Sequence, residues 1–356
     1  ATVGVRYVRT IQALSGLGTA QFTGGRMSEG VETYKRAYRL ASETLGKEAP
    51  EAMNVAHEYA GLLSKFGRYG EALEILQRVL VATRKVFDDE NRDTLATLHS
   101  IAVVMSDIGR TEESIATYQY ILATLNKQVP PSHASRLSVL NNLSDALRDV
   151  ARFEEALKVI DEVVRLRTEA LGPEAAHTLV SRSNRGGVLA ALRRYPEAIA
   201  EHRAVYAIRS RTLGEEHPDT LKGLHNLASS LSDYGQFQEA QMLFKRVVEA
   251  RTELLGARNA DTVRSMRGLS SLLISTGRSI EAKALTVKLV EASEMMRTSG
   301  GVSDTLRRSS CATVTEADKD LENLEGRAGK FDGVAKAAHH TKKGTRQRDD
   351  TGLRRR

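Results

Sequence analysis

The chain has 356 residues, 41% of them apolar, so it is long enough to bury a large core. No stretch approaches the roughly 18 consecutive apolar residues of a membrane span, and the single cysteine, Cys311, excludes a disulfide framework and a cysteine-based metal site. The net charge of +7 belongs to residues 326–356, which hold ten Lys or Arg and three Asp. The rest of the chain is neutral, so it lacks the overall excess of positive charge that is typical of a nucleic-acid-binding protein.

Residues 1–46 are predicted to form a degenerate N-terminal capping repeat, because Gly18, Gly25 and Glu29 fit the register of the repeats that follow. Glycines at positions 16, 18, 24 and 25 predict a poor first helix. The alternative is a transit peptide, because residues 1–28 contain three arginines and no acid. We expect an intracellular, reducing compartment, namely the cytoplasm, with a mitochondrial location as the alternative.

Residues 47–296 are predicted to be a regular array with a period of 42 residues and two helices in each copy. The surest anchor of the period is a Glu followed by a small residue: Glu29-Gly30, Glu71-Ala72, Glu113-Ser114, Glu155-Ala156, Glu197-Ala198, Glu239-Ala240 and Glu281-Ala282. The first helix ends near a Gly in five copies, and Ala151 and Arg193 replace it in the other two. If that position needs a positive φ, those two copies are strained by about 1 kcal/mol or close the turn differently.

Residues 297–356 are predicted to be a flexible basic tail, because no apolar period continues after Met296. The tail could contact the phosphates of a nucleic acid or an anionic surface, or act as a localisation signal; a solvated tail without a ligand is the alternative. The residues that would make such contacts are Lys342, Lys343, Arg346, Arg348, Arg354, Arg355 and Arg356.

The clearest copy of the repeat resembles the tetratricopeptide repeat. It carries the spacing of that motif in Leu227, Ala228, Leu231, Gly235, Phe237, Ala240 and Phe244. The 42-residue period, together with Leu213-Gly214, residues 217–221 (HPDTL) and Asn226-Leu227-Ala228, is similar to the kinesin light chain subfamily. The resemblance covers roughly residues 10–296 and implies an all-α, right-handed solenoid of about seven helix-turn-helix repeats.

The first helices are expected to line the concave side of the solenoid and to present a polar stripe opposite their buried face. In the kinesin light chain-like family, asparagines on these helices hold bound peptides, so the resemblance assigns this role to Asn142, Asn184 and Asn226. The predicted peptide-binding groove comprises Asn141, Asn142, Arg148, Asn184, Lys222, His225, Asn226, Arg264 and Arg267. Its basic C-terminal half suits an acidic peptide segment, and a merely solvated helix face is the alternative.

Nothing in the sequence indicates an enzyme, since it has no P-loop, no GxGxxG after a strand and no HExxH. No cofactor or metal is expected. The leading hypothesis is a non-catalytic scaffold that binds a partner peptide in the concave groove. One alternative is a structural subunit of a large ribonucleoprotein or multiprotein assembly that uses the convex surface and the basic tail. The other is a sensor fragment of a larger signalling ATPase.

Overall fold

The computed structural model describes residues 2–23, 26–257 and 259–298, which form fourteen α-helices and no strand. The helices are α1 (Thr2–Thr23), α2 (Met27–Thr44), α3 (Pro50–Phe66), α4 (Tyr69–Val86), α5 (Arg92–Asp107), α6 (Thr111–Gln128), α7 (Ala134–Asp149), α8 (Phe153–Leu171), α9 (Ala176–Ala191), α10 (Tyr195–Leu213), α11 (Pro218–Tyr234), α12 (Phe237–Leu255), α13 (Ala260–Ser275) and α14 (Ser279–Thr298). Each helix packs against the next one in the chain, which confirms the predicted all-α array of helix pairs.

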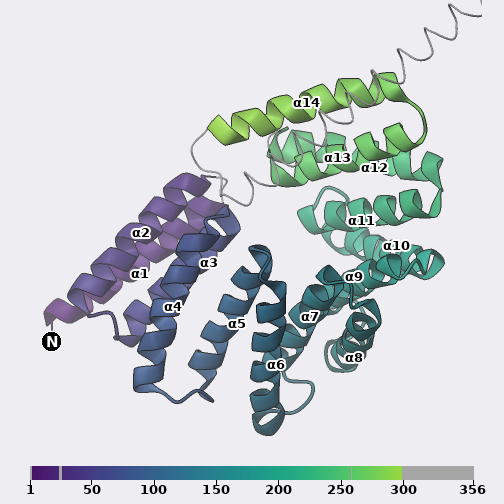
Figure 1. Ribbon diagram of the computed structural model, residues 1–356. Helices are drawn as coiled ribbons and strands as arrows, with labels where there is room; N and C mark the ends of the chain where they lie inside the picture. Colours follow the sequence, from purple (N-terminus) through teal and green to yellow (C-terminus); the bar gives the residue numbers. More distant parts are fainter. Residues whose placement is uncertain (1, 24–25, 258, 299–356) are drawn as a thin grey trace, which may run out of the picture.

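The array bends into an open arc with the odd-numbered helices on its inner side (Figure 1). Odd-numbered helices of adjacent repeats touch one another, as α7 and α9 do, and α9 and α11. No described helix is long and apolar enough to cross a membrane. The basic tail residues from Lys342 to Arg356 lie outside the described residues, so the prediction for the tail stays a prediction.

The first helix is better formed than its glycines predict, because α1 runs unbroken through Gly16 and Gly18. The reason is close packing. A Cβ on Gly18 would lie 2.5 Å from Cδ2 of Tyr34, and one on Gly30 would lie 2.7 Å from the carbonyl oxygen of Gly18. The glycines therefore allow α1 and α2 to approach closely, which offsets their low helix propensity.

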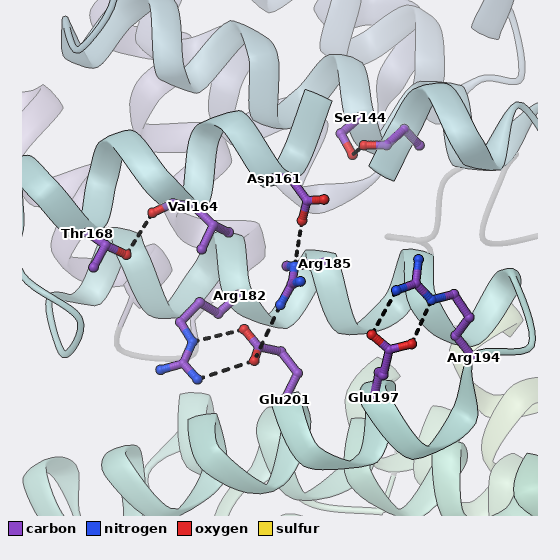
Figure 2. A network of polar contacts seen from close by, with 10 residues as sticks. Ser144, Asp161, Val164, Thr168, Arg182, Arg185, Arg194, Glu197 and Glu201 are labelled. Carbon is purple, nitrogen blue, oxygen red and sulfur yellow. Dashed lines mark hydrogen bonds and ion pairs between the residues drawn. The ribbon is translucent and has the colours of Figure 1, made fainter. Parts of the chain in front are cut away.

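The sequence keeps two positions of every repeat small, one on the first helix and one directly after the recurrent Glu on the second, and these two small-residue columns lie where the helices of each pair cross. Ala60, Ala102 and Ala228 on the first helices are fully buried, as are Ala72 and Ala240 on the second helices. Where Ser114 and Ser144 replace alanine, the hydroxyl donates to a carbonyl oxygen of the facing helix, as from Ser144 to Ala156 at 3.0 Å (Figure 2). Larger buried side chains fill the space between these contacts, so each pair is closely packed.

The Glu that recurs every 42 residues, at the start of each second helix, has a structural role that the sequence pattern did not reveal. In six of the seven copies an Arg three residues earlier pairs with the Glu at the start of the second helix: Arg26–Glu29, Arg68–Glu71, Arg110–Glu113, Arg152–Glu155, Arg194–Glu197 and Arg278–Glu281. In the sixth copy Gln236 takes the place of the Arg, and Arg203 of the preceding repeat reaches Glu239 at 2.7 Å. The pairs are exposed, so each contributes only some tenths of a kcal/mol.

The turn between the two helices of a repeat requires a positive φ, as the sequence predicts. Gly67 and Gly235 have φ of 85° and 90°, and Ala151 and Arg193 are held at 60° and 59°. The backbone N–H of the residue that follows the positive-φ position donates into the last turn in each case, as from Arg152 to the Leu147 carbonyl at 2.9 Å. The two non-glycine copies therefore keep the turn and carry the strain.

Replacing Ala151 by glycine is expected to raise the free energy of unfolding by about 1 kcal/mol, because glycine adopts a positive φ without a Cβ clash. Urea denaturation followed by circular dichroism measures the change. Gly235→Ala at the same turn two repeats later is the matched control and should lower the stability by a similar amount. If both variants left the denaturation midpoint unchanged, the turn would not be strained.

Candidate functional site

The candidate site is the inner surface of the arc, which is lined by α5, α7, α9, α11 and α13 (Figure 1). The sequence of these helices places a stripe of polar residues on this surface. We call this the inner stripe; its three asparagines are Asn142, Asn184 and Asn226. They occupy equivalent positions of successive repeats and are all half-buried. The helices on which they lie are in contact, so their side chains can bridge one repeat to the next.

Each of these asparagines bonds to the preceding odd-numbered helix through its amide nitrogen. Nδ2 of Asn142 lies 2.9 Å from Nε2 of His99, Nδ2 of Asn184 donates to Asp145 at 2.7 Å, and Nδ2 of Asn226 donates to the Ser183 hydroxyl at 3.0 Å. Burial lowers the pKa of His99, which favours the neutral ring that can accept from Asn142. The amide carbonyl oxygens of Asn184 and Asn226 have no hydrogen-bond partner within the described chain, so each of these two amides is held in place and keeps an acceptor available. The side chain of Asn142 also forms a hydrogen bond with Tyr118.

Asn141 and His225 were predicted as groove residues, but they face the next repeat instead. Asn141 is 7% exposed, and its Oδ1 accepts from the Ser181 hydroxyl at 3.2 Å. The ring of His225 meets Phe244 edge-on at 5.6 Å, and its Nδ1 lies 3.3 Å from the Ser265 hydroxyl. Both side chains occupy the same position of their repeats, one residue before the asparagine, and they bond repeats together there.

Three buried arginines lie beneath the C-terminal half of the inner stripe, and sequence reasoning missed them. Arg167, Arg209 and Arg251 are 6%, 4% and 3% exposed, and burial lowers the pKa of each. Their Nη1 atoms donate to the carbonyl oxygens of His177, Asp219 and Asp261 at 3.0, 3.1 and 2.8 Å. No carboxylate of the described chain lies within ion-pair distance of them.

The signal for these arginines was present in the sequence, because each lies five residues before the Gly that ends its helix. Arg167 also donates to the Ser181 hydroxyl at 2.6 Å, and that hydroxyl donates to Asn141. Arg251 reaches the Ser265 hydroxyl at 2.7 Å in the same way. Two of the three buried positive charges, Arg167 and Arg251, are thus connected through hydroxyl groups to the first helix of the next repeat.

The charge of the inner stripe changes sign along the array. On α7, Arg148 is neutralised by Asp145 at 3.2 Å and Asp149 at 3.3 Å, so it does not supply the free positive charge that the sequence predicts. Burial raises the pKa of Asp145 to about 6, against the opposing effect of Arg148. On α11 and α13, Lys222, Arg264 and Arg267 are exposed, and Arg264 pairs with Asp261 at 3.0 Å. The C-terminal half is therefore the electropositive part.

A separate ion-pair network ties α9 to its neighbouring outer helices (Figure 2). Arg182 forms a two-bond pair with Glu201 of α10 at 2.9 and 3.3 Å, and their side chains are only 18% and 12% exposed. Arg185 bonds to Asp161 of α8 at 2.6 Å and approaches Glu201 at 3.8 Å. Its contacts link three helices, so this network stabilises the array rather than forming a reaction centre. Among the described residues, no group of three or more His, Cys, Asp or Glu side chains could hold a metal ion.

The repeat geometry agrees with a comparison of the sequence with known families. The model of the tetratricopeptide repeat matches residues 9–80, 51–127, 135–200, 177–253 and 224–294, which together cover most of the chain. The chain is a tetratricopeptide repeat protein. Arrays of this family typically act as non-catalytic scaffolds that mediate protein–protein interactions.

Solved structures similar to this tetratricopeptide repeat protein include kinesin light chain-like repeat proteins. The nearly identical TPR-like repeats of a Podosopora anserina kinesin light chain are 28% identical, with 57% of this chain and 95% of that chain covered and a TM-score of 0.49. BtubC (BKLC) from P. vanneervenii is 18% identical over 65% of this chain and 92% of that chain, with a TM-score of 0.52.

A Rap protein complexed with competence and sporulation factor shares the fold as well. It is 13% identical over 89% of this chain and 99% of that chain, with a TM-score of 0.52. No curated protein matches the sequence. The comparisons thus establish the repeat family and its fold.

Proposed function

We propose that this protein binds an extended, acidic segment of a partner protein along the C-terminal half of its inner surface. The observation that carries the proposal is the row of asparagine carbonyl oxygens above buried arginines that lack a carboxylate partner. Asn184 and Asn226 each keep one acceptor available, and Arg167, Arg209 and Arg251 lie beneath them. A bound chain would contact the asparagine oxygens and lie within the electric field of the arginines.

The asparagines suit the backbone of the bound segment. An extended peptide has N–H groups without partners, and these can donate to fixed amide oxygens. The inter-repeat bonds of Asn184 and Asn226 hold the side chains in one orientation before binding, which lowers the entropy cost of binding. The asparagines would thus position a ligand without reading its side chains.

The positive charges suit the acidic side chains of the bound segment. Buried arginines act through a medium of low polarity, so their field reaches the inner surface with less screening than that of exposed charges. Lys222 and Arg264 add exposed positive charge at the same end. Asp219 and Asp261 act on Arg209 and Arg251 from beyond ion-pair distance, and an acidic segment would add the closer negative charge that these arginines lack.

The test is fluorescence anisotropy with a labelled, glutamate-rich peptide of twelve residues and a lysine-rich counterpart. We expect the acidic peptide alone to bind, with an affinity that falls as salt rises. Lys222→Glu combined with Arg264→Gln should weaken binding about tenfold or more, because two ion pairs at the rim of a binding surface are lost. Alanine at Asn184 or Asn226 is a poorer test, because it also breaks an inter-repeat bond.

The matched control is Lys245→Glu, which changes the same charge on the exposed face of the outer helix α12. It should leave the affinity and its salt dependence unchanged. Equal binding of the acidic and the lysine-rich peptide would contradict the proposal, and so would equal effects of the inner and outer variants.

A further inference from the structure

A hollow of about 480 Å³ opens on the outer side of the array between α2 and α4, with α3 beneath it. It lies on the opposite side of the helix pair from the inner stripe. Its floor is apolar and consists of Tyr38, Ala52, Ala56, Val79 and Ala82. At its mouth Val81 is 59% exposed and extends the apolar surface outward.

The hollow exists because two positions that are filled in later repeats carry alanine in this one. Ala52 stands where Thr94, Thr178, Thr220 and Thr262 stand, and all four threonines are buried. Ala56 stands where later repeats have Leu98, Leu140, Arg182, Leu224 and Met266. These side chains fill the space between adjacent repeats, so the gap at Ala56 is particular to the second repeat.

Two polar features distinguish the hollow from a simple packing gap. Ser42 lines the hollow, and its hydroxyl is shielded from solvent and has no hydrogen-bond partner in the described chain. Thr168, at the equivalent position of a later repeat, instead donates its hydroxyl to the Val164 carbonyl. On the rim, Lys85 pairs with Glu48 and Arg78 with Glu74, whereas Lys47 has no partner among the described residues. The rim therefore has a net positive charge.

We infer that this hollow binds residues 316–325 of the same chain, an acidic segment that contains two leucines. The sequence of the segment, EADKDLENLE, places Leu321 and Leu324 among five carboxylates and one lysine. The leucines would occupy the apolar floor, where their burial removes hydrocarbon surface from water. The carboxylates would lie against Lys47 and the other rim cations.

The length of chain allows this contact. Thr298 ends α14, and Leu321 follows about 23 residues later, so the connection can span up to about 80 Å when extended. The inner surface near Lys222 is lined by polar side chains such as Asn226 and Ser229. It could attract the carboxylates, but it would leave the two leucines in water, so the hollow fits the segment better.

The single cysteine permits a test on the full chain, because Cys311 lies just before the segment. A nitroxide spin label on Cys311 should weaken the methyl NMR signals of Val79, Val81 and Ala82 and leave those of Val180 and Val188 on α9 unchanged. Ala56→Leu should fill the hollow and restore the weakened signals. Ala200→Leu, at an exposed position of α10, is the control for adding a leucine and should have no effect.

A second variant does not touch the folded array, so it tests the contact even if Ala56→Leu unfolds the protein. Leu321→Ser combined with Leu324→Ser should also restore the signals of Val79, Val81 and Ala82. Unchanged signals at the hollow in the labelled protein would overturn the inference. Weakening at α11 and α13 instead would overturn it as well, by placing the segment on the inner surface. Weakening seen only when labelled and isotope-enriched copies are mixed would show contact between two molecules and overturn the intramolecular assignment.

Discussion

Replacing Arg182 by alanine is expected to lower the free energy of unfolding by about 2–3 kcal/mol. Arg182 and Glu201 are largely buried and form two bonds to each other, so removal of the guanidinium leaves the Glu201 carboxylate in a poorly solvated place (Figure 2). Arg185, at 3.8 Å, offers only partial compensation. Urea denaturation of the variant and the unmodified chain gives the difference.

Two comparisons separate this effect from a general effect of losing an arginine. Arg165→Ala removes an exposed i,i+4 pair with Glu169 and should cost less than about 0.5 kcal/mol. The double variant Arg182→Leu with Glu201→Leu copies the leucines found at these positions in the next repeat, Leu224 and Leu243. It should recover most of the lost stability, because an apolar pair of similar size has no charge to desolvate. If Arg182→Ala cost no more than Arg165→Ala, the network would not stabilise the array.

Much of the fold could be predicted because the repeat carries its own local signals. The glycine column predicts where the first helices end. At Ala151 and Arg193 the register left two possibilities, a strained positive φ or a different turn, and the structure has the positive φ. The small columns likewise predict where the helices of a pair cross, as at Ala102. These features depend on residues within one repeat, so a 42-residue pattern contains the information needed.

The site was harder to predict because its contacts join different repeats. Asn141 and Asn142 are adjacent in sequence, yet one bonds to the next repeat and the other to the preceding one. The spacing of polar residues along a helix predicts which face of the helix a side chain is on, to within about one residue position. It does not predict which residue of another repeat that side chain contacts. The buried cations Arg167 and Arg251 were missed for a related reason. Arginine near the end of a helix suggests an exposed position, but the first turn of the next helix contacts each of these side chains.

The N-terminal repeat shows that the intrinsic helix propensity of its residues does not by itself decide whether a helix forms. Gly16 and Gly18 lower the intrinsic stability of α1, yet the helix forms because Tyr34 packs against the surface that the missing Cβ leaves open. The hollow at Ala56 is the opposite case, since a good helix former leaves a gap between repeats. Neither outcome follows from the helix propensity of one residue, because both depend on what the adjacent helix places opposite it.

We expect His202 to lower the free energy of unfolding by about 2.5 kcal/mol as the pH falls from about 7.5 to about 4.5. Replacing His202 by phenylalanine should abolish this decrease. His202 is 3% exposed, its Nδ1 has no hydrogen-bond partner in the described chain, and its ring lies against Gly186, where a Cβ would be 2.6 Å from Cε1. Burial lowers the pKa of His202 to about 4, against a smaller opposing effect of Glu201. Tyr118 and Phe244 occupy the same position in other repeats, so an aromatic ring fits there.

The sign of the effect follows from proton binding. Above the ordinary histidine pKa of about 6.5, His202 is neutral in both states and contributes no pH dependence. Between about pH 6.5 and pH 4 the unfolded chain binds a proton that the folded chain excludes, so the folded state loses stability as the pH falls. His225, whose pKa burial also lowers to about 4, acts in the same direction. Asp145, with its pKa raised to about 6, acts in the opposite one, because the folded state binds its proton more readily.

These other groups are present in both proteins, so the difference between the unmodified chain and His202→Phe isolates the one histidine. Urea denaturation at a series of pH values should give two curves that diverge below about pH 6.5, with the variant the more stable at acid pH. His177→Phe, at an exposed position of α9, serves as the control and should not separate the curves in this way. Curves that stay parallel for His202→Phe would mean that the buried ring accepts a proton in the folded state, and the packing of His202 against Gly186 would then have to open at acid pH.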